Sequence, residues 1–303
     1  MKKKTEKRNA VFSTACASIV LCALLLFFCA AGIGTTQGEA SLATAAAATA
    51  GQDCVHLPIL MYHSVLKDTA RSGTYVVTPT QLESDMQYLK QHGYETVVMQ
   101  DLIDYVDGVG ELPAQPVILT FDDGYYNNLT YVLPLLQKYG MCAVISVVGR
   151  YTELFSDTPD PNPNYGHLSF DEIRSLADTG CVEIQNHSYD MHSLTGRQGS
   201  SQQKGESDQA YHKVFCEDVS HLQTLLSNRC GLAPTTFTYP FGLIGDGTVN
   251  CLQELGFRAS LTCFEKQNCI VAGDSDCLFG LGRYNRPAKY TTEAYMQKAL
   301  GGS

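Results

Sequence analysis

The chain has 303 residues, of which 44% are hydrophobic, so it can bury a full-sized core in one α/β barrel or in two smaller domains. This composition excludes disorder over most of the length. The formal net charge is -10, and the first eight residues carry five positive charges against one Glu, so the remainder carries about -14 (-10 minus +4). Such an acidic chain repels a phosphate backbone, which excludes nucleic acid as a partner.

The N-terminus predicts export. Basic residues between Lys2 and Arg8 precede an almost uninterrupted apolar run over residues 11–33, and this run reaches the ~20 residues that span a bilayer. We expect residues 1–33 to be a cytoplasmic basic stub and a signal-anchor transmembrane helix. Residues 34–55 should be a flexible linker, and 56–303 a domain outside a single-pass cell membrane. The small residues that follow the apolar run offer cleavage sites, so secretion is the alternative.

Cysteine usage also bears on the exported domain. Some of the nine cysteines beyond the apolar run should pair, and the last four are close enough in sequence to be candidates. The odd number leaves at least one free thiol, and the sequence has no C-x-x-C pair that would suggest a structural zinc knuckle. The nine are Cys54, Cys142, Cys181, Cys216, Cys230, Cys251, Cys263, Cys269 and Cys277.

Apolar runs alternate with amphipathic stretches from residue 58 onward. Two of the amphipathic stretches begin with a capping box, at Thr80 with Glu83 and at Ser169 with Glu172. The alternation predicts a parallel sheet covered by helices, and about seven such units favour a single-domain, irregular (β/α)7-type barrel. The expected strands are 58–62, 96–99, 117–121, 142–148, 182–185, 236–239 and 258–261.

Polar side chains follow several of these strands. Functional groups of a parallel α/β fold gather at the strand ends, because the following loops converge on one face. One strand ends on two adjacent carboxylates, Asp122 and Asp123, which stay ionised cheaply only beside a cation. Another runs into His187, and a spacing of five would put His192 about 140° away on a helix, so the two meet only if a loop curls back. Two imidazoles and one carboxylate would form a three-ligand metal site with positions open for water.

Three motifs resemble those of the polysaccharide deacetylases that share the NodB homology domain (carbohydrate esterase family 4). Residues 120–124, Thr-Phe-Asp-Asp-Gly, match the first motif of that family. Residues 187–192 match its histidine motif with one additional spacer, and residues 239–242, Tyr-Pro-Phe-Gly, resemble its third motif. The resemblance implies the family's fold and a metal-dependent hydrolase.

The chain departs from the family pattern in its later motifs. Thr236 stands where members commonly carry Arg, the chain has no Trp, and a late Leu-x-His motif is missing. Residues 60–63, Leu-Met-Tyr-His, resemble the version of that motif in a permuted branch that includes exported poly-N-acetylglucosamine deacetylases. Because the first strand could lie beside the last one, His63 would reach the site from the other end of the chain. The resemblance covers residue 58 to the C-terminus, with the core motifs within 115–303.

The resemblance implies roles for five side chains. The reaction would be hydrolysis of the N-acetyl group of an N-acetylhexosamine in a cell-envelope or extracellular polysaccharide. Asp123, His187 and His192 would hold a divalent cation, with Zn²⁺ first and Co²⁺, Ni²⁺ or Mn²⁺ as alternatives. Asp122 would be the general base, and His63 the acid that protonates the departing amine.

Other residues complete the expected site. The backbone N–H of Tyr239 would stabilise the oxyanion, and Tyr125, Tyr239 and Phe241 would contact the substrate. In the family an Arg pairs with the first Asp of the first motif. Arg283, near a late strand end, is our candidate for that position.

Two other functions remain open. A mononuclear iron oxygenase also uses two His and one carboxylate, but a candidate base beside the metal-ligating Asp disfavours it. The second alternative is a catalytically weak, membrane-tethered glycan-binding module on the same fold. Its glycan contacts would be Tyr125, Tyr126, Tyr165 and Tyr239.

The substrate polymer is also open at this point. Peptidoglycan, poly-N-acetylglucosamine and chitin-like oligomers present the same acetamide, so the sequence does not choose among them. Discrimination would lie in two irregular segments that break the strand and helix rhythm, residues 151–167 and 195–209, which we expect to be binding loops or mobile covers. The sequence also leaves the oligomeric state undetermined.

Overall fold

The structure is a computed structural model that describes residues 54–301. The expected membrane segment at 1–33 lies outside the described residues, as does the expected linker up to residue 53. Between residues 54 and 301 no helix combines the length and the apolar character needed to cross a bilayer. The first described residues are part of the folded domain, since Cys54 is disulfide-bonded to Cys269 and Val55 begins strand β1.

A parallel sheet of eight strands forms the centre of the domain. Seven strands lie in the order β10-β9-β8-β7-β6-β2-β12, and β5 pairs with β6 off this path. Every pair in the sheet is parallel, as the strand and helix alternation predicts. The strands are β2 (Ile59–Tyr62), β5 (Glu95–Thr96), β6 (Pro116–Phe121), β7 (Ala143–Val147), β8 (Val182–Asn186), β9 (Thr236–Thr238), β10 (Ala259–Leu261) and β12 (Tyr284–Asn285).

The sheet is curled into a half-barrel and is not a fully paired ring, which corrects the expectation of a barrel. Its edge strand β10 meets the chain just before β12 at one isolated parallel bridge, Leu261 with Leu281. Between them the chain makes an excursion that contains β11 (Asn268–Ile270) and the 3₁₀ turn η4 (Ser275–Leu278). At β12 only two residues pair with β2, so the last strand is too short to close the ring along its length.

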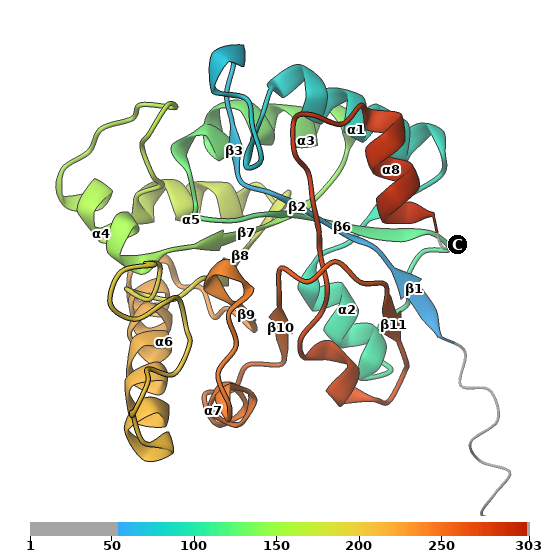
Figure 1. Ribbon diagram of the computed structural model, residues 1–303. Helices are drawn as coiled ribbons and strands as arrows, with labels where there is room; N and C mark the ends of the chain where they lie inside the picture. The colour runs from blue at the N-terminus through green and yellow to red at the C-terminus, as the bar shows by residue number, and fades with distance from the viewer. Residues whose placement is uncertain (1–53, 302–303) are drawn as a thin grey trace, which may run out of the picture. The chain divides into compact units, whose positions relative to one another are not determined.

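Helices cover the sheet, as Figure 1 shows, with α1, α3 and α8 on one side and α2 on the other. The helix α1 contacts both α3 and α8, and α5 packs on α6. The helices are α1 (Pro79–Gln91), α2 (Met99–Val106), α3 (Leu133–Tyr139), α4 (Gly149–Asp157), α5 (Phe170–Asp178), α6 (Asp208–Cys230), α7 (Thr248–Glu254) and α8 (Thr292–Leu300).

Short elements fill the connections. A two-residue parallel pair and an antiparallel pair lie outside the main sheet. These strands are β1 (Val55–Leu57) with β11, and β3 (Ser64–Val65) with β4 (Val76–Val77). The remaining turns are η1 (Thr69–Arg71), η3 (Pro240–Gly242) and the π-helical turn η2 (Asn128–Val132).

Alternation along β6 places the catalytic candidates on the inner face of the curl. Leu119 and Phe121 belong to the core under the outer helices, whereas Ile118 belongs to a second core with the buried side chains of α2 and β10. Because successive side chains point to opposite faces, Thr120 and then Asp122 lie on the same side as Ile118. The strand therefore delivers Asp122 to the inside of the curl at its carboxyl end.

Three local expectations need correction. The expected strand 96–99 ends at Thr96, because Met99 already begins α2, where the Glu183 carboxylate accepts hydrogen bonds from the N–H groups of Met99 and Gln100. The first capping box lies two residues earlier than expected: Pro79 at the first helical position makes Thr78 the N-cap, and Gln81 is its partner. The first part of the irregular segment 151–167 is helical, since α4 extends to residue 157.

The second capping box is where the sequence places it, and it allows a test. Ser169 accepts a hydrogen bond from the N–H of Glu172, and the Glu172 carboxylate accepts one from the N–H of Ser169. We expect Ser169→Ala to lower the free energy of unfolding by about 1 kcal/mol, because α5 loses its cap. Urea denaturation measures this. Ser175→Ala, on the exposed part of the same helix, is the control and should leave the midpoint unchanged or raise it.

The disulfides differ from the expected pairing among the last four cysteines. Cys54 bonds to Cys269, which joins the antiparallel pair β1 and β11, and Cys216 on α6 bonds to Cys251 on α7. Each bond joins residues that the fold, and not the sequence, brings together. Five cysteines in the described part of the chain are free thiols, Cys142, Cys181, Cys230, Cys263 and Cys277.

Candidate functional site

A pocket of about 380 Å³ lies at the carboxyl ends of β2, β6 and β8, where the sequence predicts the site. All of the predicted residues that would bind the metal or move a proton line it. Residues from the loops after β3 and β9 and from β12 also line the pocket. The lining residues are Met61, His63, Tyr75, Asp122, Asp123, Tyr125, His187, His192, Leu194, Phe241, Cys263 and Asn285.

Asp123, His187 and His192 converge in this pocket. Oδ1 of Asp123 lies 3.5 Å from Nε2 of His187 and 3.0 Å from Nε2 of His192. The loop after β8 curls back, so that the two imidazole centroids are 5.0 Å apart. Among the described residues these three form one of two groups of side chains that are close enough together to hold a metal ion.

The hydrogen bond on the far side of His187 tests whether a cation fits. Nδ1 of His187 lies 2.8 Å from the carbonyl oxygen of Thr238, and a carbonyl only accepts, so Nδ1 carries the hydrogen. The Nε2 lone pair of the neutral ring then faces Oδ1 of Asp123. That oxygen is buried, and no group within residues 54–301 forms a hydrogen bond with it. Two facing acceptors need a proton or a metal ion between them, and the donor set suits a divalent cation.

The electrostatics of these groups agree with that reading. Burial by itself raises the pKa of Asp123, but the two imidazoles outweigh it and hold the pKa well below the usual value. Burial lowers the pKa of His187, yet the Asp123 and Asp122 carboxylates raise it overall. The carboxylate is therefore ionised and attracts positive charge to the centre of the three side chains.

Unusual backbone geometry presents the ligands. The candidate ligand Asp123 has a left-handed φ of 71°, and Ser188, which follows the candidate ligand His187, has one of 72°. At Gly124 φ is 64°, and a Cβ would lie 2.9 Å from Cγ1 of Val147, so only glycine fits this turn against β7. Tight turns after both strands thus point the carboxylate and the imidazole at each other.

Asp122 is held by Arg283. The guanidinium donates two hydrogen bonds to the carboxylate, at 2.7 Å and 2.8 Å, and both side chains are buried, with exposures of 0% and 1%. Burial raises the pKa of Asp122, but Arg283 and His187 outweigh it, so the pKa is lowered and the group is ionised. Arg283 also donates to Thr120 and to the carbonyl of Thr262, which fixes the fork in one orientation.

His63 completes the polar floor from the first strand of the sheet. Its Nε2 lies 3.9 Å from Oδ2 of Asp122, and its ring is tilted over Tyr75 with centroids 4.8 Å apart. The strand β2 lies between β6 and β12, so the first and last strands of the sheet are neighbours, as the permuted motif implies. Burial lowers the pKa of His63 and outweighs the two carboxylates that raise it.

The expected roles of Tyr239 are wrong. Its N–H donates a hydrogen bond to the carbonyl of Leu261, 3.0 Å away, so it is not free to stabilise an oxyanion. Its side chain is fully buried and its hydroxyl lies 2.9 Å from that of Thr248, so it does not line the pocket. Tyr125 and Phe241 do line it, and the Phe241 ring lies 4.6 Å from that of His192.

Sequence reasoning missed His167, which supports the metal candidates from behind. Its Nδ1 lies 2.9 Å from the carbonyl oxygen of Asp123. Its ring stacks on Tyr125 and is tilted against Tyr151, with centroids 4.7 Å and 4.5 Å away. It lies in an irregular segment with no strand end to mark it. The pocket-lining Tyr75 and Leu194 were missed too, and their signal is visible only in three dimensions, as large exposed apolar side chains that line the pocket.

Comparison with known proteins agrees with the motifs. Residues 110–260 match the sequence model of the polysaccharide deacetylase family. The chain is 28% identical over 207 residues to a putative polysaccharide deacetylase, YxkH, of Bacillus subtilis, and this alignment covers 68% of the chain and 64% of that relative. It is 25% identical over 219 residues to a poly-β-1,6-N-acetyl-D-glucosamine N-deacetylase of Staphylococcus epidermidis, over 72% of the chain and 71% of that protein.

Solved structures show the same fold. A de-N-acetylase from Aggregatibacter actinomycetemcomitans superposes with a TM-score of 0.66 at 24% identity, over 80% of this chain and all of that one. IcaB from Ammonifex degensii gives a TM-score of 0.62 at 24% identity, over 81% of this chain and 96% of that one. Motifs, sequence match and fold coincide on one region, and the chain carries a polysaccharide deacetylase domain.

Proposed function

We propose that this protein is a metal-dependent hydrolase that removes N-acetyl groups from N-acetylhexosamine residues of a cell-envelope or extracellular polysaccharide. One observation carries the proposal: three side chains able to hold a cation and an arginine-anchored carboxylate face the same pocket. The named activity of the Staphylococcus relative supports an N-acetylglucosamine polymer as the substrate class.

Asp123, His187 and His192 would hold the cation, with Zn²⁺ first and Co²⁺, Ni²⁺ or Mn²⁺ as alternatives. A divalent ion there would activate water as a nucleophile near neutral pH and polarise the acetamide carbonyl. The ligand set of two imidazoles and one carboxylate is the kind that leaves positions open for water and substrate. His187 is kept in the ligating tautomer by its hydrogen bond to Thr238.

Asp122 accepts the proton of the attacking water. It is adjacent to the metal-ligating Asp123, so it lies within reach of the same centre, and its ionised state is maintained by Arg283. The bidentate guanidinium directs both carboxylate oxygens and prevents Asp122 from turning to the cation itself. The adjacent carboxylates thereby divide the work of ligand and base.

His63 protonates the departing amine. Its exposure of 14% and its place in the pocket lining leave one face open to a bound sugar. We expect His63→Ala to lower kcat about 10²-fold, at the lower end for a general acid, because water in the pocket also donates a proton. Acetate release measures the rate. Metal content should stay at the wild-type level, and its loss would remove the acid assignment; the exposed His56→Ala is the control.

Acetate release from a panel of polymers tests the proposed function. Peptidoglycan, poly-N-acetylglucosamine and chitin oligomers are incubated with the metal-loaded wild-type protein and with Asp122→Asn. Release that depends on Asp122 supports deacetylation, and the preferred polymer identifies the substrate. Binding of acetylated oligosaccharide with no acetate release would instead favour a glycan-binding module.

We further propose that the domain works outside the cell membrane, tethered by the N-terminal segment. The support is the basic stub followed by the apolar run at residues 11–33. A cell-envelope polymer as substrate agrees with that side of the membrane. Two measurements on expressing cells test this location. After fractionation a tethered domain should remain with the membrane, and protease added to intact cells should cleave it.

A further inference from the structure

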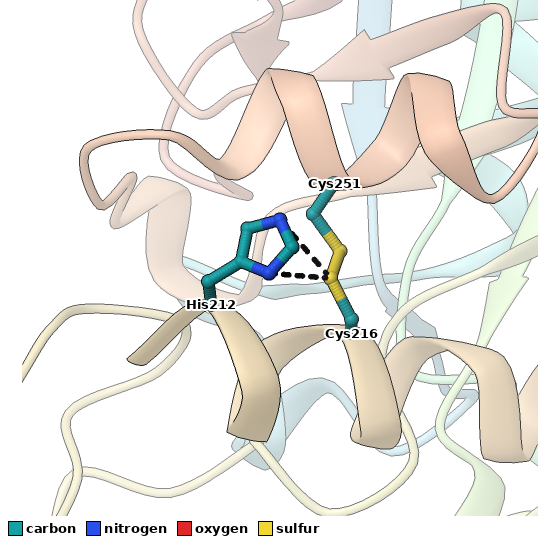
Figure 2. A group of neighbouring side chains, drawn as sticks. All are labelled: His212, Cys216 and Cys251. Carbon is teal, nitrogen blue, oxygen red and sulfur yellow. Dashed lines mark hydrogen bonds between the residues drawn. A yellow bond between two sulfur atoms is a disulfide. The ribbon is translucent and has the colours of Figure 1, made fainter. Parts of the chain in front are cut away.

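A second group of metal-ligating side chains lies where α6 packs on α7 (Figure 2). None of its members lines the pocket. His212 and Cys216 are one helical turn apart on α6, and Cys251 faces them from α7. One ligand atom of each lies within 4.8 Å of the others. Cys216 and Cys251 form a disulfide, so the two sulfurs and the imidazole are already gathered at one point.

Glu254 extends the group. Its Oε2 lies 3.4 Å from Nε2 of His212, and it follows Cys251 by three residues on α7, so both project from the same side of that helix. A carboxylate behind an imidazole is the arrangement that orients histidine ligands in metal sites. With Nε2 paired to Glu254, Nδ1 of His212 remains to bind a metal ion.

We propose that these residues form a redox-gated site for a thiophilic divalent cation of the Zn²⁺ class. In the oxidised chain the Cys216–Cys251 bond fills the site. A dithiol reductant breaks that bond: two electrons and two protons pass to the sulfurs, which become two thiols, and the reductant becomes its own disulfide. When the cation binds, both thiol protons leave to solvent, and two thiolates, the imidazole of His212 and a water molecule complete four positions.

The spacing suits a tetrahedral ion. Zn–N and Zn–S bonds of about 2.0 Å and 2.3 Å place two ligand atoms roughly 3.5 Å apart for nitrogen and sulfur, and roughly 3.8 Å apart for two sulfurs. Both ring nitrogens of His212 lie 3.7 Å from Sγ of Cys216. The two cysteine Cα atoms are 5.9 Å apart, so side-chain rotation alone separates the released sulfurs by the required distance.

Access favours reduction and metal entry at this disulfide. The side chains of His212 and Glu254 are 42% and 63% exposed, and Cys216 is partly exposed, whereas Cys251 is buried. A reductant therefore reaches Cys216 from solvent, and the cation enters beside the imidazole. The other disulfide, Cys54–Cys269, belongs to neither of the two metal-capable groups within residues 54–301, which makes it a matched control.

Cobalt absorption and zinc content of the full chain test the proposal. The protein is reduced with dithiothreitol, desalted without air and titrated with Co²⁺ or Zn²⁺, beside an untreated sample. We expect reduction to add about one equivalent of Zn²⁺ and to produce the thiolate-to-Co²⁺ charge-transfer band, because two thiolates join the ligand set. Equal metal content and no sulfur band in the reduced sample would overturn the proposal.

Variants separate this site from other thiols and from the pocket. Cys216→Ser should lose the band and the added equivalent, whereas Cys269→Ser, which also removes one thiol, should keep both. Glu254→Gln should weaken Zn²⁺ binding about 10-fold through the orientation of His212. Persistence of the band in Cys216→Ser would assign it to the free cysteines and sink the site. His187→Ala should leave the band intact, since the pocket ligands contain no sulfur, so failure here is distinct from failure of the proposed deacetylase function.

Discussion

Asp122→Asn is expected to lower kcat for acetate release by about 10⁴-fold, at the upper end for a general base, because the amide cannot take the proton of the attacking water. The substitution keeps the shape of the side chain and one of the two oxygens that accept a hydrogen bond from Arg283. Asp123, His187 and His192 are untouched, so the metal content measured by mass spectrometry should equal that of the wild type. Rate and metal content together distinguish a lost base from a lost cofactor.

The matched control for that substitution lies in the same region of the molecule. Asp190 lies in the loop between the two ligand histidines, and its half-exposed carboxylate pairs with Arg150; Asp190→Asn removes that charge. It should alter kcat by less than about threefold, since an exposed pair contributes little. A wild-type rate in Asp122→Asn would transfer the base to another group, and a parallel loss of metal would make Asp122 a ligand.

Arg283→Ala is expected to reduce both stability and turnover. Removing the guanidinium leaves the Asp122 carboxylate 1% exposed without its partner, and breaking a buried pair in this way costs about 3–5 kcal/mol of the free energy of unfolding. The freed carboxylate also gains a higher pKa and a choice of orientations, so kcat should fall as well. Urea denaturation and acetate release on the same sample measure the two effects.

Arg283→Lys keeps the test informative if the alanine variant does not fold. A lysine retains the charge but not the fork that holds both oxygens of Asp122, so stability should largely return while kcat stays low. Unchanged activity in either variant would show that Arg283 does not orient the base. Arg258→Lys, at a half-exposed pair with Asp107, is the control and should behave like the wild type.

The parts of the site that the sequence predicts are those that form a pattern of consecutive residues. A buried strand that stops on two carboxylates locates Asp122 and Asp123, because one Asp before Gly is an ordinary turn signal but two adjacent carboxylates stay ionised cheaply only beside a cation. The same reasoning places His187 after β8. The parallel sheet is predictable too, since its strands are short apolar runs separated by helical patterns.

The parts that escape prediction depend on contacts between distant segments. His167 supports the carbonyl of Asp123 across 44 residues, and the Cys54–Cys269 bond spans 215. The barrel fails to close along its length because β12 pairs with β2 at only two residues. Tyr239 was misplaced because its motif gives no sign that its N–H is taken by the neighbouring strand at Leu261. Such pairings are set by packing, which a local pattern does not record.

The neighbouring positions of β2 and β12 have a consequence for how activity is acquired during synthesis. The three candidate metal ligands lie between residues 123 and 192, so a chain made from its N-terminus carries all of them well before it is complete. Arg283 precedes β12, which pairs with β2 only after almost the whole domain has emerged. A growing or C-terminally shortened chain would therefore carry the three candidate ligands but not the arginine that anchors Asp122, so the proposed base is held in place only after the last strand pairs with the first.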